Sequence, residues 1–198
     1  MQNEIEVKFF PIDINEIVKN LQKIGAQQQT ERLLMRRVVF DRSKNPDLKC
    51  TYARVRDEGD KITMSLKVNA TSSGDILDQK ELQVSISSFK GGVDILEGVG
   101  LQKTSYQENY RTTWVFRNSE IVIDEWPALE PYIEIESQSV EELQEISALL
   151  ALDFSTRLIV STDELYAQKY GISKETALNL ISHITFSEIP NEFKHSQK

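Results

Sequence analysis

The chain has 198 residues, 39% of them hydrophobic and 27% charged, with a formal net charge of −8. This acidic balance argues against non-specific nucleic-acid binding, which needs a basic surface. No apolar run approaches the roughly 20 residues of a membrane span, no signal-peptide pattern opens the chain, and Cys50 is the single cysteine. We therefore expect a cytoplasmic protein without nucleic-acid or membrane partners.

The first half of the chain predicts strands with two helices. Charged and apolar residues alternate over 4–9, as in a strand with one charged and one apolar face. Asp13 is a suitable N-cap for a helix that Gly25 ends. The hairpin signal Glu58-Gly59-Asp60 lies between two strands. After the first helix, the sequence predicts strands over 26–40, 51–57, 61–69 and 78–86 and a short helix over 88–98.

The second half predicts further strands and then a helical end. The turn Asn118-Ser119 separates two of the strands. The predicted strands cover 102–108, 110–117, 120–125 and 132–136, and the predicted helices cover 140–152, 163–170 and 173–184. From Ser187 the sequence is polar, which is typical of a frayed end. We expect one domain over 1–184 and a polar C-terminal tail over 185–198.

These elements indicate an α+β fold with eight or nine antiparallel strands and few helices. Closing such a sheet into a barrel removes its exposed edges. A sandwich is the alternative, and it would place hydrophobic residues on the inner faces. Many alternating positions here are charged, which favours a barrel with a polar interior.

Charged residues recur in phase along the strands. Any one pair is more typical of a solvated face or a surface salt bridge. The acidic positions are Glu4, Glu6, Asp124, Glu134 and Glu136, and the basic positions are Lys8, Arg54, Arg56, Lys67 and Arg111. Divalent cations such as Mg²⁺ prefer oxygen ligands, and polyphosphates are held by several Arg and Lys side chains. The set therefore predicts a metal-chelated polyphosphate inside the barrel.

The opening Glu4-Ile5-Glu6-Val7-Lys8 resembles the ExExK signature of the CYTH superfamily, the triphosphate tunnel metalloenzymes. Further segments resemble the family in the same order: Ala53-Arg54-Val55-Arg56, Ser65-Leu66-Lys67, Lys80-Glu81-Leu82, Arg111 with its following residues, Asp124-Glu125-Trp126-Pro127, Tyr132-Ile133-Glu134-Ile135-Glu136 and Thr156-Arg157-Leu158-Ile159-Val160. The resemblance covers about residues 3–170.

The resemblance implies an eight-stranded antiparallel β-barrel, the triphosphate tunnel, with flanking helices. It implies that phosphates are held by Lys8, Arg54, Arg56, Lys67, Arg111 and Arg157. It also implies that Glu81, within the substrate-binding set, positions a basic neighbour or binds the metal indirectly. It implies Mg²⁺ or Mn²⁺ as cofactor, held by Glu4, Glu6, Asp124, Glu134 and Glu136. Glu4, Glu6 and Lys8 are the expected catalytic residues.

The family includes triphosphatases and class IV adenylyl cyclases. We expect a metal-dependent hydrolase of inorganic triphosphate or a small organic triphosphate, with a cyclase forming cyclic AMP from ATP as one alternative. A polyphosphate-binding module without turnover is the other. Monomer and homodimer both fit the sequence.

One position departs from the family pattern. Many members carry a lysine two residues before the late arginine, and here that position is Asn109. Lys103 or Arg36 could supply the missing charge.

Overall fold

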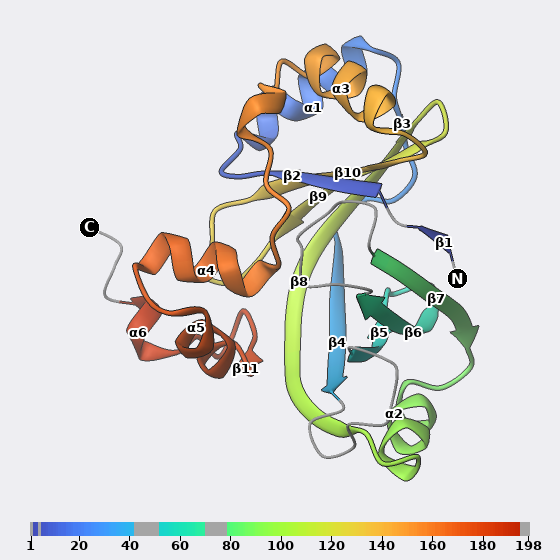
Figure 1. The fold of residues 1–198 in the computed structure, drawn as a ribbon, viewed down its shortest axis with the longest axis vertical. Helices are drawn as coiled ribbons and strands as arrows, with labels where there is room; N and C mark the ends of the chain where they lie inside the picture. Colours follow the sequence, from blue (N-terminus) through green and yellow to red (C-terminus); the bar gives the residue numbers. More distant parts are fainter. Residues whose placement is uncertain (1, 4, 42–51, 70–78, 195–198) are drawn as a thin grey trace.

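The structure is a computed structural model that describes residues 2–3, 5–41, 52–69 and 79–194, without the side chains of 2–3, 67–69 and 79–80. It confirms the α+β fold as a curled sheet whose eight longer strands are antiparallel, flanked by helices (Figure 1). The strands are β1 (Gln2–Asn3), β2 (Ile5–Phe9), β3 (Gln27–Gln28), β4 (Leu33–Asp41), β5 (Tyr52–Asp57), β6 (Ile62–Asn69), β7 (Gln79–Ile86), β8 (Gln102–Phe116), β9 (Ser119–Glu125), β10 (Tyr132–Ser137) and β11 (His183–Ile184). The helices are α1 (Ile14–Lys23), α2 (Phe89–Gly98), α3 (Val140–Leu149), α4 (Thr162–Tyr170), α5 (Lys174–Leu180) and α6 (Asn191–Lys194), with a 3-10 turn at Phe154–Thr156.

The strand order is β1-β7-β6-β5-β4-β8-β9-β10-β2. The start of the chain contacts both ends of this order, because Gln2–Asn3 pairs with β7 while Ile5–Phe9 pairs with β10. At Lys8 the free edge of β2 also forms a bridge with Leu158. The sheet therefore curls until one short segment connects its two edge strands.

Two helices cover the half of the sheet formed by β2, β9 and β10 (Figure 1). Asp13 caps α1, its carboxylate accepting from the backbone of Asn15 and Glu16, and α1 buries Ile17 and Leu21 against the sheet. Ser139 caps α3 in the same way, and α3 packs into the same core. The outer face of these strands is thus apolar and covered, which leaves their other face for the charged residues.

The half formed by β4–β7 is covered by α2 (Figure 1). A Cβ on Gly92 would lie 2.5 Å from Ile86 Cδ1, so α2 approaches the sheet closely at this glycine. The long strand β8 runs through both halves and connects them.

The C-terminal helices α4–α6 form a third core with Trp126 and Tyr132 at one end of the sheet. Phe193 of α6 is buried there, so the expectation of a frayed C-terminal end is wrong for residues up to 194.

In the part of the chain that the structure describes, no helix combines the length and apolar character needed to cross a membrane.

Four of the predicted elements are divided, shortened or merged in the structure. The predicted strand over 26–40 is divided into β3 and β4, and the predicted helix over 173–184 ends at Leu180 before β11. The predicted strands over 102–108 and 110–117 are one strand, β8. Asn109, which falls between the two predicted strands, lies inside β8, where its side chain has hydrogen-bond partners.

Candidate functional site

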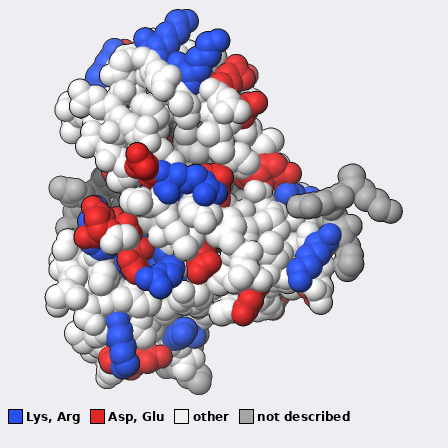
Figure 2. Space-filling model, turned by 180° about the vertical axis from the view of Figure 1, so that it is seen from behind, with Lys and Arg blue, Asp and Glu red and all other residues white. Residues whose placement is uncertain are grey.

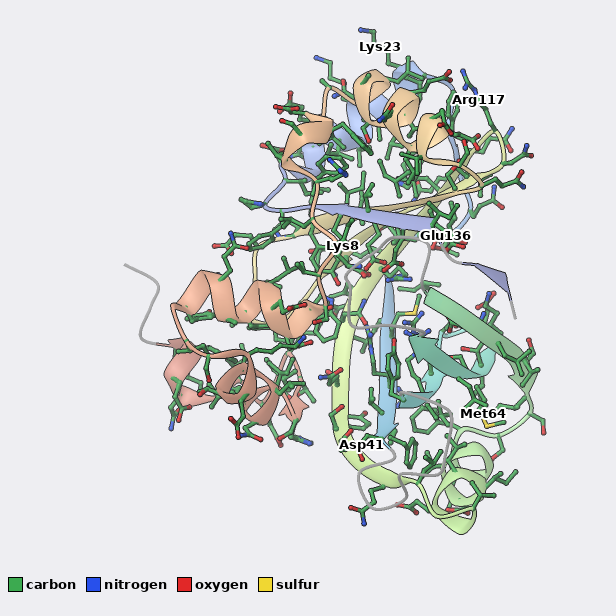
Figure 3. All side chains as sticks on the ribbon, in the orientation of Figure 1. Lys8, Lys23, Asp41, Met64, Arg117 and Glu136 are labelled. Atoms are coloured by element: carbon green, nitrogen blue, oxygen red, sulfur yellow. The ribbon has the colours of Figure 1, made fainter. Side chains whose placement is uncertain are left out.

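Strand register places most of the predicted site residues on one face of the sheet. Lys8 lies opposite Glu134, Arg111 opposite Asp124, and Glu6 opposite Glu136. In Figure 3, Lys8 and Glu136 lie on the side of β2 and β10 that faces β4–β7, away from α1 and α3. The charged face predicted from alternation is therefore the interior of the curled sheet.

Four strands bring together what we call the carboxylate wall: Glu6, Lys8, Arg111, Asp124 and Glu134. Lys8 Nζ lies 2.8 Å from Glu6 Oε1 and 3.1 Å from Glu134 Oε1. Arg111 Nε donates to Asp124 Oδ1 at 2.8 Å, and Arg111 Nη2 donates to Glu134 Oε2 at 3.1 Å. Each cation contacts two carboxylates, and Glu134 contacts both cations.

The carboxylates determine the charge state of this wall. Burial alone would lower the pKa of Lys8, but Glu134 and Glu6 outweigh it and hold that pKa well above its usual value. Burial also opposes the charge of Arg111, yet Asp124 and Glu134 raise its pKa. Both cations are therefore protonated at neutral pH, and their charges are paired with carboxylates of the same wall.

Facing the carboxylate wall is a second group, the arginine wall: Arg37, Arg54 and Arg56. Arg37 on β4 lies opposite Arg56 on β5, and Arg54 is on the same face of β5. Arg37 and Arg56 are 9% and 7% exposed. The buried Nε atoms of all three arginines have no hydrogen-bond partner among the described residues. Buried polar groups are nearly always hydrogen-bonded, so these three nitrogens indicate a place for an anion.

The arginines of this wall also repel one another. Burial, followed by the charge of Arg54, lowers the pKa of Arg37 to about 10. Burial and the neighbouring arginines lower the pKa of Arg56 well below its usual value. Arg54 Nη2 lies 3.3 Å from Glu81 Oε1. The wall remains positive at neutral pH and is stabilised by any anion that enters it.

Asn109 connects the two walls. Its Oδ1 accepts a hydrogen bond from Arg37 Nη2, and its Nδ2 donates to Asp124 Oδ1 at 2.9 Å. Because Arg111 also donates to Asp124, hydrogen bonds and ion pairs run without a gap from Arg37 to Glu6.

Arg37 was missed by the sequence reasoning, which favoured Arg36 or Lys103 as the extra cation. Arg36 forms an ion pair with Asp57, and its side chain is 52% exposed. Lys103 is exposed near the far end of β8. The signal for Arg37 was strand phase, since the antiparallel pairing of β4 with β5 places it directly opposite Arg56.

The structure describes some of the remaining predicted residues fully, and others only in part or not at all. Glu4 lies outside the described residues, and so does the side chain of Lys67, whose backbone pairs with Glu81. Glu136 is exposed, next to Glu6 in register. Arg157 is exposed and stacks on Phe154, so the structure does not bring it to either wall, and its role stays a prediction.

Oxygen donors for a cation are present in the carboxylate wall. Among the residues whose placement is described, no three carboxylate, histidine or cysteine side chains form a ready-made metal cluster. Mg²⁺ usually takes one or two protein carboxylates and completes its shell with water and phosphate oxygens. Glu6, Glu134 and Glu136 on adjacent strands fit that mode of binding.

The outside of the molecule differs from this interior. On the face shown in Figure 2, most of the surface is neither acidic nor basic, and in places Lys and Arg side chains lie next to Asp and Glu side chains. In the arginine wall, by contrast, like charges are gathered and buried.

The family comparison identifies one model, the CYTH domain, which matches residues 2–170. No curated protein matches the chain.

Solved structures show the same fold at low identity. A candidate adenylate cyclase from Vibrio parahaemolyticus has a TM-score of 0.70 and 14% identity, covering 84% of this chain and 98% of its own. The PH1012 protein of Pyrococcus horikoshii has a TM-score of 0.67 and 18% identity, with coverage of 82% and 98%. The candidate adenylyl cyclase HpAC1 from Hippeastrum, described as having a dominant triphosphatase activity, has a TM-score of 0.57 and 15% identity, with coverage of 86% and 97%.

Proposed function

The chain belongs to the CYTH domain family, and from this premise we propose that it is a divalent-metal-dependent hydrolase of inorganic triphosphate or a small organic triphosphate. The observation that carries the proposal is the arginine wall. The Nε atoms of its three arginines are buried and have no hydrogen-bond partner in the part of the chain that the structure describes, whereas the cations of the carboxylate wall are paired with carboxylates. A polyanion such as triphosphate supplies what these arginines lack.

The two walls suit the two ends of a triphosphate that carries a metal ion. Arg54 and Arg56 bind phosphate oxygens on one side. Lys8 and Arg111 lie on the other side, and the Lys8 ammonium has three protons, so it can donate to phosphate while it contacts Glu6 and Glu134. Phosphoryl transfer depends mainly on positioning and charge neutralisation, and fixed cations of this kind provide both.

The proposed metal ligands are Glu6, Glu134 and Glu136, with Glu4 and Asp124 as the further acidic residues of the set. A bound Mg²⁺ or Mn²⁺ would neutralise phosphate charge and make a water molecule more nucleophilic. Lys8 holds Glu6 and Glu134 on the interior face, at 2.8 and 3.1 Å, and thereby orients them. Asp124 is fully buried and accepts from Arg111 and Asn109, so it serves mainly to position Arg111.

The cyclase alternative needs a pocket for adenine. Trp126 and Tyr132 are the aromatic side chains next to Arg37 and Lys8, and both are buried. Trp126 donates to Tyr132 Oη at 2.9 Å and stacks on Arg37. These two rings are thus engaged in packing, which favours a triphosphatase over a cyclase.

The test is a product assay with purified protein, Mg²⁺ or Mn²⁺, and inorganic triphosphate, thiamine triphosphate and ATP in parallel. We expect orthophosphate from a triphosphate and no cyclic AMP from ATP. Glu6→Gln is expected to reduce turnover by a factor of about 100 or more, since it removes a charge from the metal-binding set. Much of the binding of triphosphate should remain, because the arginine wall is intact.

Glu145→Gln is the matched control, since Glu145 is an exposed glutamate on α3 that pairs with Arg117. It should hydrolyse the substrate at the wild-type rate. Cyclic AMP with pyrophosphate would make the protein a cyclase. Binding of triphosphate without turnover under either metal would favour the binding module.

A further inference from the structure

We propose that Arg37 is a further substrate-binding residue, which delivers from β4 the positive charge that position 109 of β8 lacks. Asn109 is its matched partner and holds the guanidinium in place. This inference rests on the proposed function, because the ligand is the triphosphate bound between the two walls. It adds one residue to the phosphate-binding set and explains why Asn109 can stand at a position where the family pattern predicts lysine.

The surroundings of Arg37 leave one of its nitrogens available. Its Nη2 donates to Asn109, and its Cζ lies 4.4 Å from the centroid of the Trp126 ring. Its Nε is buried without a hydrogen-bond partner among the described residues. The stacking on Trp126 and the hydrogen bond to Asn109 fix the plane of the guanidinium, but they leave hydrogen-bond donors of the group available. If Arg37 had a purely structural role, its buried polar atoms would be expected to have hydrogen-bond partners within the protein.

The orientation of Asn109 is set by both of its neighbours. The carbonyl oxygen must accept from Arg37, and the amide nitrogen must donate to Asp124. A lysine at 109 could donate to Asp124, but it has no acceptor for Arg37. It would also add a cation next to Arg37 and Arg111. Arginine at 37 and lysine at 109 are therefore mutually exclusive, and each can supply the same charge from a different strand.

The test measures binding of inorganic triphosphate by calorimetry in EDTA, so that hydrolysis does not interfere. Arg37→Gln should bind roughly 10- to 100-fold more weakly than wild type, the range typical of a lost hydrogen bond to a charged group. Asn109→Lys alone should also bind more weakly, because it displaces Arg37. The double variant, Arg37→Gln with Asn109→Lys, should regain about a factor of ten or more over Arg37→Gln.

Thermal unfolding without ligand provides a second readout. Arg37 is buried and lies near Arg54, so Arg37→Gln should leave the melting temperature of the ligand-free protein unchanged or raise it. A purely structural arginine would give the opposite sign. Arg36→Gln is the control, since Arg36 is exposed and pairs with Asp57. Its affinity for triphosphate should equal that of wild type.

Equal affinity of Arg37→Gln and wild type would overturn the proposal. So would a double variant that binds no better than Arg37→Gln, since the two positions would then not exchange the charge. If wild type itself binds no triphosphate, with EDTA or with Mg²⁺, the proposed function fails instead. Arg37→Lys, which keeps the charge, should retain more affinity than Arg37→Gln and covers the case in which glutamine does not fold.

Discussion

The two walls of the site solve the problem of buried charge in opposite ways. In the carboxylate wall, Lys8 and Arg111 each contact two carboxylates, and burial is offset within the protein. In the arginine wall, Arg37 and Arg56 are paired in register on adjacent strands, and buried Nε atoms lack hydrogen-bond partners among the residues described. The charges of the first wall are paired without a ligand, whereas under the proposed function the second is stabilised by a bound anion. We therefore expect substitutions in the two walls to change the stability of the ligand-free protein in opposite directions.

The largest expected effect comes from the carboxylate wall. Asp124→Ala removes the main acceptor of Arg111 and one partner of Asn109 at a fully buried position. Breaking a buried pair typically costs about 3–5 kcal/mol, so we expect that loss in the free energy of unfolding measured with urea. Glu120→Ala, at an exposed site on the same strand, should stay within about 0.5 kcal/mol of wild type. A loss below that of Glu120→Ala would contradict the assigned role of Asp124.

The next effect tests the arginine wall with its ligand. Inorganic triphosphate at a hundred times its dissociation constant should stabilise the folded protein by about 2.7 kcal/mol, or roughly 5–10 °C in melting temperature. The shift should shrink with added NaCl, because the contact is electrostatic. Sulfate at the same concentration is the control and should give a smaller shift, since it carries less charge. Equal shifts would mean that the wall does not select a polyphosphate.

Lys8→Met tests whether the carboxylate wall needs its cation. It leaves Glu6 and Glu134 without their shared partner and should cost about 2 kcal/mol of unfolding free energy at pH 7. The folded-state pKa of Lys8 is raised, so its contribution is fully present below the unfolded pKa of about 10.5 and is lost only as pH rises through the higher folded value. Denaturation at pH 7 and 9 should therefore give the same difference from wild type. A difference that vanishes by pH 9 would argue against this pairing.

The smallest effect has the opposite sign. Arg56→Met removes a buried cation whose pKa is lowered by burial and by the neighbouring arginines. We expect the ligand-free protein to be unchanged or more stable by about 1 kcal/mol, measured by urea unfolding in phosphate-free buffer. The same variant should gain less stability than wild type when triphosphate is added. A clear loss of stability in the ligand-free state would show that the two walls do not differ as described.

Sequence reasoning predicted the strands and the charged face on which most of the candidate site residues lie. Alternation made this possible, because period-two patterns such as Glu6 and Lys8 report directly which face a residue occupies. Alternation does not predict hydrogen bonds between side chains that are distant in the sequence. Asn109 has low strand propensity and falls between two of the predicted strands, but it lies within β8, where its side chain is hydrogen-bonded to Arg37 and Asp124.

Arg36 and Arg37 show the same limit. Both are basic neighbours, and composition does not distinguish them. Register does, because a shift of one residue moves a side chain to the other face of the sheet. Arg37 faces Arg56 in the interior, while Arg36 pairs with Asp57 outside. The register of β4 against β5, rather than the residue type, decides which arginine faces the interior.

The segment Gln2–Phe9, which contacts both edge strands of the sheet, has a consequence for how the protein folds. Its partners on β10 are Ile133–Ser137, which leave the ribosome long after it does. Until then, Lys8 has no Glu134, and β2 has no neighbour on that side. Contacts so distant in sequence carry a high loop-closure entropy and form slowly. During synthesis β2 therefore remains without its β10 partner until β10 has been made. Closure of the sheet then also brings Lys8 and Glu134 together.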